Sequence, residues 1–197
     1  MTNWVKPVTL QGKHVRLEPM TEAHIPDLAE IGIGQSFWNY MLYGDIKTEE
    51  DMRQWVLDIL SRVENGTDMP FVAIHLASGR VAGATRYLNI LPKDRGLEIG
   101  GTWYGLDFQR TPVNTECKYL LLTHAFETLK CIRVQLKTDL LNERSQKAIE
   151  RIGAIREGVL HNHMILPDGR YRDSVFYSIL DKEWGTVKKN LEAKLTR

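Results

Sequence analysis

The segment that most constrains the fold is residues 97–129, where an apolar strand pattern ends in Trp103 and Tyr104 and leads through a short turn into a long helical pattern. Thr111 is a residue type that caps helices, and Pro112 suits a first helical turn, where its missing N–H would have no partner. The first N–H groups of a helix point outward at the positive end of the helix dipole. The segment therefore predicts a strand–turn–helix unit with an anion site at the helix start, the alternative being an ordinary buried crossover.

A second strand–helix unit follows in residues 132–153. Ile132, Val134 and Leu136 alternate with polar residues, which is the pattern of a half-buried strand. Asn142 is placed to cap the next helix, and Gly153 lies where a C-terminal cap belongs. The apolar face of that helix comprises Ser145, Ala148, Ile149 and Ile152. Right-handed crossovers make such strands parallel neighbours, so both helices are expected to start at the same edge of the sheet.

The rest of the chain adds helices from about residue 21 and over 48–63, and strands at 15–17, 71–76, 81–91, 155–166 and 171–180. Asp168 and Gly169 lie between the last two strands and indicate a hairpin. The fold class expected is α+β in α/β/α layers, with a mixed, mostly antiparallel sheet flanked by helices. We expect one domain over residues 1–197, with its core at about 10–184 and a C-terminal helix at 182–196.

Composition limits the classes of partner. The chain has 197 residues, 43% of them hydrophobic, and a net charge of +1, so it can bury one core but offers no strong field for nucleic acid. Its apolar runs are much shorter than the roughly 20 residues that span a bilayer, so no membrane partner is predicted. The start, Met1-Thr2-Asn3-Trp4, lacks the charged region and apolar core of a signal peptide, which predicts a cytoplasmic protein.

Metal binding and disulfide formation are disfavoured. Cys117 and Cys131 lie in apolar periodic contexts and are expected to be buried structural thiols. His161 and His163 share one face of a predicted strand, and no third ligand lies near them in the sequence. We therefore predict no metal site.

Three motifs in this order resemble the GNAT family of acyl-CoA N-acyltransferases, within it the RimJ/RimL-like branch. They are Glu98-Ile99-Gly100, the segment from Gln109 to Glu116, and the segment from Asn142-Glu143-Arg144-Ser145 to Glu150-Arg151-Ile152-Gly153. The resemblance spans residues 10–184 and includes the Asp168-Gly169 hairpin and Tyr177 before Glu183-Trp184. It implies the GNAT fold, acetyl-CoA as cofactor, and transfer of its acetyl group to a primary amine, either a protein N-terminal α-amine or a small-molecule amine.

The sequence departs from the family pattern at three positions. Pro112 and Asn114 replace glycines of the usual phosphate loop, and proline also removes one amide donor. The resemblance then implies that phosphate binding rests on the amides of Arg110, Thr111, Val113, Asn114 and Thr115, helped by the side chains of Gln109, Arg110 and Thr111. Ile149 stands where many members carry a tyrosine that protonates the departing thiolate.

Acyl transfer from a thioester needs positioning more than a protein nucleophile. Glu98 is the candidate base, although a paired structural carboxylate is an alternative reading. A backbone N–H near Trp103 or Tyr104 is the candidate oxyanion donor that the resemblance implies. Ser145 is the candidate acid for the thiolate, with water as its alternative, and Asn142 is a candidate pantetheine contact as well as a helix cap.

Two function classes remain at this level. The first is an acetyl-CoA-dependent N-acetyltransferase, favoured by the presence of Glu98, Asn142 and Ser145. The second is a non-catalytic acyl-CoA or ligand sensor on the same fold, favoured by Pro112 and the other departures. The sequence does not identify the acceptor. The C-terminal helix packs either on its own domain or on a second subunit, which would make a homodimer.

Overall fold

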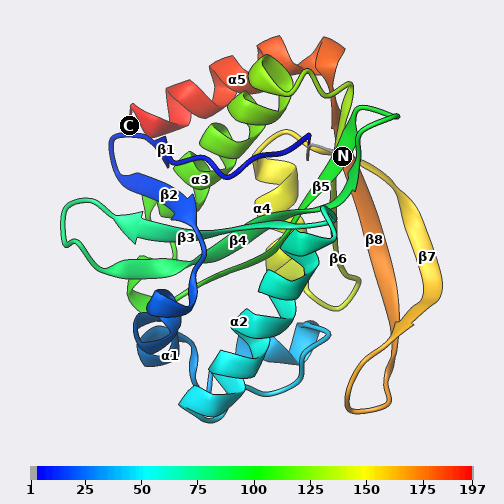
Figure 1. Cartoon of the computed structure of the whole chain (residues 1–197). Coiled ribbons are helices and arrows are strands. Elements are labelled where there is room, and N and C mark those ends of the chain that lie inside the picture. The colour runs from blue at the N-terminus through cyan, green and yellow to red at the C-terminus, as the bar shows by residue number, and fades with distance from the viewer. Residues whose placement is uncertain (1–3, 197) are drawn as a thin grey trace.

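The computed structural model describes residues 4–196, so Met1, Thr2 and Asn3 of the signal-peptide argument lie outside the described residues. An eight-stranded sheet with the order β1-β2-β3-β4-β5-β6-β8-β7 forms the centre (Figure 1). Its strands are β1 Leu10–Gln11, β2 Val15–Pro19, β3 Met69–His75, β4 Val81–Leu91, β5 Gly96–Tyr104, β6 Arg133–Asp139, β7 Ile155–Ile165 and β8 Tyr171–Leu180. Among these strands only the β5–β6 pair is parallel, which confirms the predicted mixed, mostly antiparallel sheet.

Helices cover both faces of the sheet. They are α1 Ile25–Gly32, α2 Glu49–Glu64, α3 Pro112–Thr123, α4 Glu143–Arg151 and α5 Asp181–Leu195. One apolar cluster joins the sheet to α3, α4 and α5, and a second joins the opposite face to α1 and α2 (Figure 1). Trp184, Val187 and Leu191 of α5 are buried in the first cluster, so the C-terminal helix packs on its own domain.

The predicted helix caps are confirmed. The Thr111 hydroxyl accepts a hydrogen bond from the Val113 N–H at 3.3 Å, and the Asn142 side chain accepts one from the Ser145 N–H at 3.0 Å. Gly153 follows α4 with φ +98°, the left-handed conformation that a C-terminal glycine supplies.

Two helix boundaries differ from the sequence prediction. The helix expected near residue 21 begins as a short 3₁₀ turn, Glu22–His24, and α1 starts only at Ile25, because Pro26 fixes the first helical turn. The long helix expected to reach residue 129 ends at Thr123 and continues as a π-helical turn over His124–Thr128.

The apolar cluster on the α1–α2 side is rich in aromatic side chains. Trp38 and Trp55 are buried on the α1–α2 side, where they meet Trp103 of β5 with ring centroids 5.3 and 5.8 Å from it. Phe37 stacks on Trp103 at 5.4 Å and is only partly buried. This cluster fixes one face of β5 against the helices.

Glu116 of α3 binds the turn between β1 and β2, a role that the sequence did not reveal. Its carboxylate is 4% exposed and accepts hydrogen bonds from the backbone N–H groups of Lys13, His14 and Val15 at 2.6–2.9 Å. Charge-assisted bonds of this kind tie α3 to the sheet edge and are expected to stabilise the fold.

Both cysteines are buried free thiols, as predicted, and burial raises the pKa of Cys117 and of Cys131 to about 12. Within residues 4–196, no helix combines the length and the apolar character needed to cross a bilayer.

Candidate active site

Strands β5 and β6 stop pairing and diverge in the middle of the sheet. They pair only from Gly96–Arg133 to Glu98–Gln135, although β5 runs on to Tyr104 and β6 runs on to Asp139. Beyond Glu98, the edge of β5 that faces β6 therefore has no described strand beside it. Such an edge offers backbone N–H and C=O groups to an extended ligand, which would lie as a substitute strand. We call this opening the β5–β6 wedge.

A bulge with two glycines lies on the β5 edge of the wedge. The β4–β5 register shifts between Ala84 and Arg86, and Gly101 has φ +56°. A Cβ atom at Gly100 would lie 3.2 Å from Glu98 Oε1, and one at Gly101 would lie 3.1 Å from Arg86 Nε. The missing Cβ atoms at these two positions therefore leave a small space beside β5 that the Glu98 carboxylate and the Arg86 guanidinium border. We call this space the glycine cradle.

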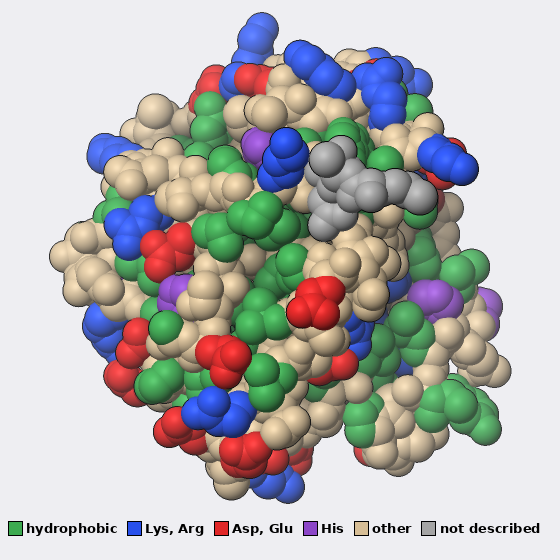
Figure 2. Space-filling view, viewed as in Figure 1, with side chains coloured by type: hydrophobic (Ala, Val, Ile, Leu, Met, Phe, Trp, Pro, Cys, Tyr) green, Lys and Arg blue, Asp and Glu red, His purple; other side chains and the backbone are tan. Residues whose placement is uncertain are grey.

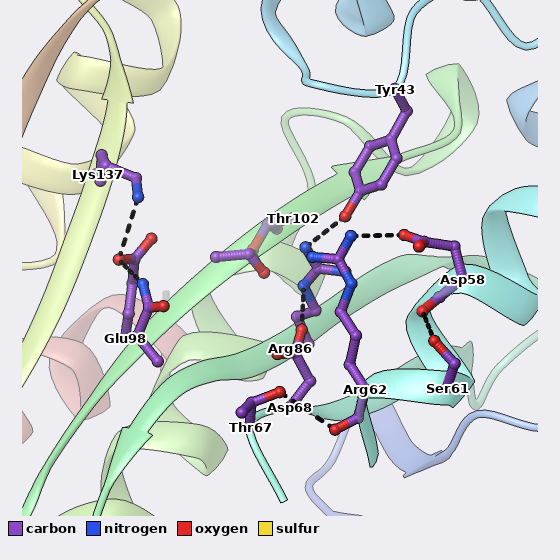
Figure 3. A network of polar contacts seen from close by, with 12 residues as sticks. Tyr43, Asp58, Ser61, Arg62, Thr67, Asp68, Arg86, Glu98, Thr102 and Lys137 are labelled. Atoms are coloured by element: carbon purple, nitrogen blue, oxygen red, sulfur yellow. Dashed lines mark hydrogen bonds and ion pairs between the residues drawn. The ribbon is translucent and has the colours of Figure 1, made fainter. Parts of the chain in front are cut away.

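Glu98 is the β5 residue of the last β5–β6 pair, and 2% of its surface is exposed. Its Oε2 accepts hydrogen bonds from Asn89 Nδ2 at 3.0 Å and Gln135 Nε2 at 2.8 Å, and lies 3.5 Å from Lys137 Nζ (Figure 3). All three contacts converge on Oε2, whereas Oε1 lies toward the glycine cradle. The carboxylate is therefore fixed at one oxygen and directed at the opening by the other.

The two aromatic residues at the end of β5 belong to the cores. The Trp103 side chain is buried on the α1–α2 side and the Tyr104 side chain on the α3 side, where burial raises the pKa of Tyr104 well above its usual value. The Gly105 N–H donates to the Ala82 carbonyl of β4 at 3.0 Å. Because backbone groups alternate along a strand, the Tyr104 N–H points away from β4, toward the wedge.

The turn before α3 is built by its own side chains. Gln109 Nε2 donates to the Tyr104 carbonyl at 2.8 Å, and Thr111 Oγ1 donates to the Phe108 carbonyl at 2.7 Å. Arg110 is exposed and has φ +61°, a conformation that non-glycine residues seldom adopt. The structure thus gives Gln109 a bond within the turn and leaves the Arg110 side chain in solvent.

The other residues expected in the phosphate site divide between core and surface. Val113 is buried in the core, Asn114 is half-buried, and Thr115 is 4% exposed and accepts a hydrogen bond from Arg151 Nη1 of α4 at 2.9 Å. The Thr115–Arg151 bond joins the first turn of α3 to the end of α4. The amides at the start of α3 remain the part of this segment best suited to an anion.

The start of α4 lies at the carboxyl end of β6. Asn142 Oδ1 is taken up by the cap, so the Asn142 side chain has its Nδ2 group left to offer. Ser145 is half-buried on the first turn. Ile149 is 7% exposed and belongs to the core. A buried apolar side chain therefore occupies the position at which the resemblance implies a tyrosine.

Sequence reasoning missed the charged residues on the face of the sheet that carries Glu98. Arg86 of β4 lies 3.2 Å from Asp68 and donates to the Tyr43 hydroxyl at 2.6 Å (Figure 3). Arg172 of β8 donates to the Tyr40 carbonyl at 3.1 Å. The two arginines tie the end of the 3₁₀ turn Ser36–Tyr40 and the residues that follow it to β4 and β8. Their only sequence signal is a charge within an otherwise apolar strand pattern.

His163 completes this polar face. Its ring packs edge-on against Phe176 at 5.3 Å, and burial, with Lys137 and Arg172, lowers its pKa. His161 instead meets Asp173 at 2.8 Å. The described residues hold no group of three or more His, Cys, Asp or Glu side chains suited to a metal ion.

Residues 14–155 match the sequence profile of the acetyltransferase (GNAT) domain, which is most of the chain. The chain belongs to the GNAT family. A curated relative in this family, YdaF of Bacillus subtilis (strain 168), is provisionally named a ribosomal N-acetyltransferase and is 33% identical over 109 residues. That match spans 55% of this chain and 58% of the relative's length, and it supports the RimJ/RimL-like branch.

Solved structures of GNAT proteins share the whole fold. A crystal structure provisionally described as an acetyltransferase, from T. thermophilus, is 40% identical, covers 98% of this chain and 99% of its own, and has a TM-score of 0.89. Mycobacterium smegmatis RimJ, solved in complex with CoA-disulfide, is 20% identical, covers 95% of each chain and has a TM-score of 0.81, a likeness of fold. The predicted GNAT fold is confirmed.

Proposed function

We propose that this GNAT protein is an acetyl-CoA-dependent N-acetyltransferase whose acceptor is a primary amine, in the first place a protein N-terminal α-amine. The observation that carries the proposal is the β5–β6 wedge, with Glu98 in the last strand pair before the wedge and α3 beginning shortly after the end of β5. An open strand edge, a helix start suited to an anion and a buried carboxylate would then form one site.

The residues of the wedge fit an acyl-CoA. The free edge of β5 would pair with the pantetheine amides, with Asn142 Nδ2 as a further contact. The diphosphate would lie at the amides that begin α3, with Gln109, Arg110 and Thr111 supporting the turn. A side chain at Gly100 or Gly101 would fill the space that the acetyl group needs. When bound, acetyl-CoA supplies an activated thioester.

The catalytic roles follow from placement. Glu98 Oε1, directed at the glycine cradle, would take the proton that the attacking amine loses. The Tyr104 N–H would donate to the developing oxyanion. Ser145 stays a candidate donor to the departing sulfur, since it lies on the first turn of α4. An α-amine, with a pKa of about 7.7 to 8.0, needs less help than a lysine side chain.

The polar face beside the wedge favours a peptide acceptor over a polyamine. Arg86 Nη1 is buried and has no hydrogen-bond partner among residues 4–196. A guanidinium donor requires an acceptor atom, which a peptide supplies next to its α-amine and a simple polyamine does not. On the face drawn in Figure 2, charged side chains of both signs are interspersed, and a notch separates the β7–β8 hairpin from the α2 side. We infer that the acceptor approaches on the Arg86 side.

A non-catalytic acyl-CoA sensor is the second candidate. Pro112 removes an amide from the phosphate turn, and Ile149 belongs to the core where many members have a catalytic tyrosine. A sensor of this kind would still bind acyl-CoA in the wedge but would not catalyse acetyl transfer.

The test is acetyl transfer followed by mass spectrometry. The purified protein, acetyl-CoA and peptides with ribosomal-protein N-termini should give peptides that gain one acetyl group at the α-amine. The same peptides with a blocked N-terminus should stay unmodified even where they carry lysine. Binding of acetyl-CoA without transfer to any peptide or small amine would contradict the proposed acetyltransferase function and support the non-catalytic acyl-CoA sensor.

A further inference from the structure

Lys118 of α3 is a buried cation that the roles given above leave unused. It is 5% exposed, its Nζ donates to Thr102 Oγ1 at 2.6 Å, and burial lowers its pKa to about 8. Among residues 4–196, no carboxylate forms an ion pair with this ammonium. Burying an unpaired charge is costly, and an apolar side chain would fill the space at lower cost. Packing alone therefore gives no reason for a lysine here.

The titratable groups around Lys118 do not neutralise it. Cys117 of the same helix and Tyr104 of β5 both keep their protons, because burial raises the pKa of the thiol and of the phenol. Glu116 is turned to the backbone of residues 13–15, and Arg151 of α4 binds Thr115. The Lys118 ammonium is thus buried against the sheet, and the partner that the described residues give it is the Thr102 hydroxyl.

That hydroxyl belongs to the β5–β6 wedge. Thr102 follows the glycine bulge on β5, beyond the last residue that pairs with β6, and is partly exposed. An ammonium can only donate, so Thr102 Oγ1 accepts from Lys118 and keeps its own hydrogen for another group. Within the chain the neighbours are Thr85 Oγ1 at 2.8 Å and the Gly100 carbonyl at 3.5 Å. A group bound in the wedge would be a third acceptor for that hydrogen.

We propose that Thr102, rather than Ser145, donates a proton to the sulfur of the departing CoA and that Lys118 restores the proton on Thr102. As the carbon–sulfur bond breaks, its electron pair stays on sulfur, which takes the Thr102 hydroxyl hydrogen. Thr102 Oγ1 takes a proton from the Lys118 ammonium, and the neutral amine regains one from water when the wedge reopens. Thr102 is then the catalytic acid and Lys118 the positioning residue behind it, in place of the tyrosine that Ile149 replaces. This inference rests on the proposed function.

Lys118→Met removes the charge while keeping the side chain's length. We expect kcat to fall about 100-fold, the size of a lost acid, with little change in the Kd of acetyl-CoA. The wild-type kcat should decline above about pH 8, where Lys118 loses its proton, and the variant should lack that decline. Since the folded state disfavours the ammonium, the stability of the wild type should rise between about pH 8 and the ordinary lysine pKa of about 10.4, and Lys118→Met should melt at or above the wild type at pH 7.

Variants of Thr102 and of its neighbour Thr85 distinguish the loss of a proton donor from a change in packing. Thr102→Val should lose about as much kcat as Lys118→Met, and the double variant should lose no more than either. Thr85→Val makes the same change at the neighbouring hydroxyl on β4 and should keep the wild-type kcat. A Lys118→Met enzyme with wild-type kcat and pH profile would overturn the inference, as would equal losses in Thr102→Val and Thr85→Val.

A binding readout keeps this inference distinct from the proposed function. The thiol of bound CoA can be titrated by the ultraviolet absorbance of its thiolate, with no acceptor present. In the wild type its pKa should lie below that of free CoA, because an ammonium acts on the sulfur through Thr102, and in Lys118→Met the shift should vanish. Equal thiol pKa values in both proteins would reject the Thr102–Lys118 pair even if the wild type acetylates peptides. A lowered thiol pKa in the wild type without acetylation of any peptide would support the Thr102–Lys118 pair but contradict the proposed acetyltransferase function.

Discussion

Replacing Glu98 with glutamine should lower kcat/KM for an N-terminal peptide by about 100-fold or more, with a smaller change in the Kd of acetyl-CoA. Glutamine keeps the shape of the side chain but cannot take a proton from the amine. The carboxylate is fixed at Oε2 by Asn89, Gln135 and Lys137, and only Oε1 is directed at the glycine cradle. Initial rates over a range of pH, with peptide and acetyl-CoA varied, measure the effect.

A matched carboxylate controls for lost stability. Glu116 is buried to a similar degree on α3, and Glu116→Gln should cost about 2 kcal/mol of stability, because two amide hydrogens would then face backbone N–H donors. Its kcat/KM should stay near the wild-type value at a temperature where both proteins are folded. If Glu98→Gln instead melts lower and keeps its kcat/KM at all pH values, Glu98 is a structural carboxylate that serves Lys137.

Gly100→Val should abolish measurable transfer, a loss in kcat/KM of more than about 100-fold, while the protein still folds. A Cβ atom at Gly100 would lie 3.0 Å from Leu88 Cδ2 and 3.2 Å from Glu98 Oε1, so the valine methyls would fill the glycine cradle. Valine suits an extended strand, and Gly100 lacks the positive φ that would strain it. The measurements are kcat/KM, which should fall, and the Kd of acetyl-CoA, which should rise.

The matched control is Gly158→Val. Gly158 also lies in a strand, β7, and a Cβ atom there meets nothing within 4 Å. This variant should bind acetyl-CoA and acetylate peptides like the wild type. A Gly100→Val protein with normal transfer would show that the acetyl group lies elsewhere, and equal losses in the two variants would point to general damage to the sheet.

Local patterns predicted most of the fold. The strands expected at residues 81–91 and 171–180 have those bounds in the structure, because apolar runs between turn residues leave little choice of register. Thr111 and Asn142 cap their helices as expected, since capping depends on the next three residues. The end of α3 was missed because the π-helical turn at His124 keeps the apolar spacing of a helix.

The site was less accessible from the sequence because its parts come from distant segments. Strand alternation identified Glu98, but its partners lie on β4 and β6, and nothing in their sequence marks Asn89, Gln135 or Lys137 as neighbours of one carboxylate. The β5–β6 wedge depends on where two strands stop pairing, which no local pattern encodes. Lys118 falls at a helical position that reads as ordinary, and its burial emerges only from packing.

The most direct test of the account is the thermal unfolding midpoint of the purified protein with and without acetyl-CoA. A ligand at about 100 times its Kd adds roughly 2.7 kcal/mol of stability, which for a chain of this size raises the midpoint by about 5 to 10 °C. We expect that rise for the wild type, and a much smaller one for Gly100→Val. An unchanged midpoint at millimolar acetyl-CoA would show that the loop with Pro112 and Asn114 no longer binds the cofactor, and would contradict the account.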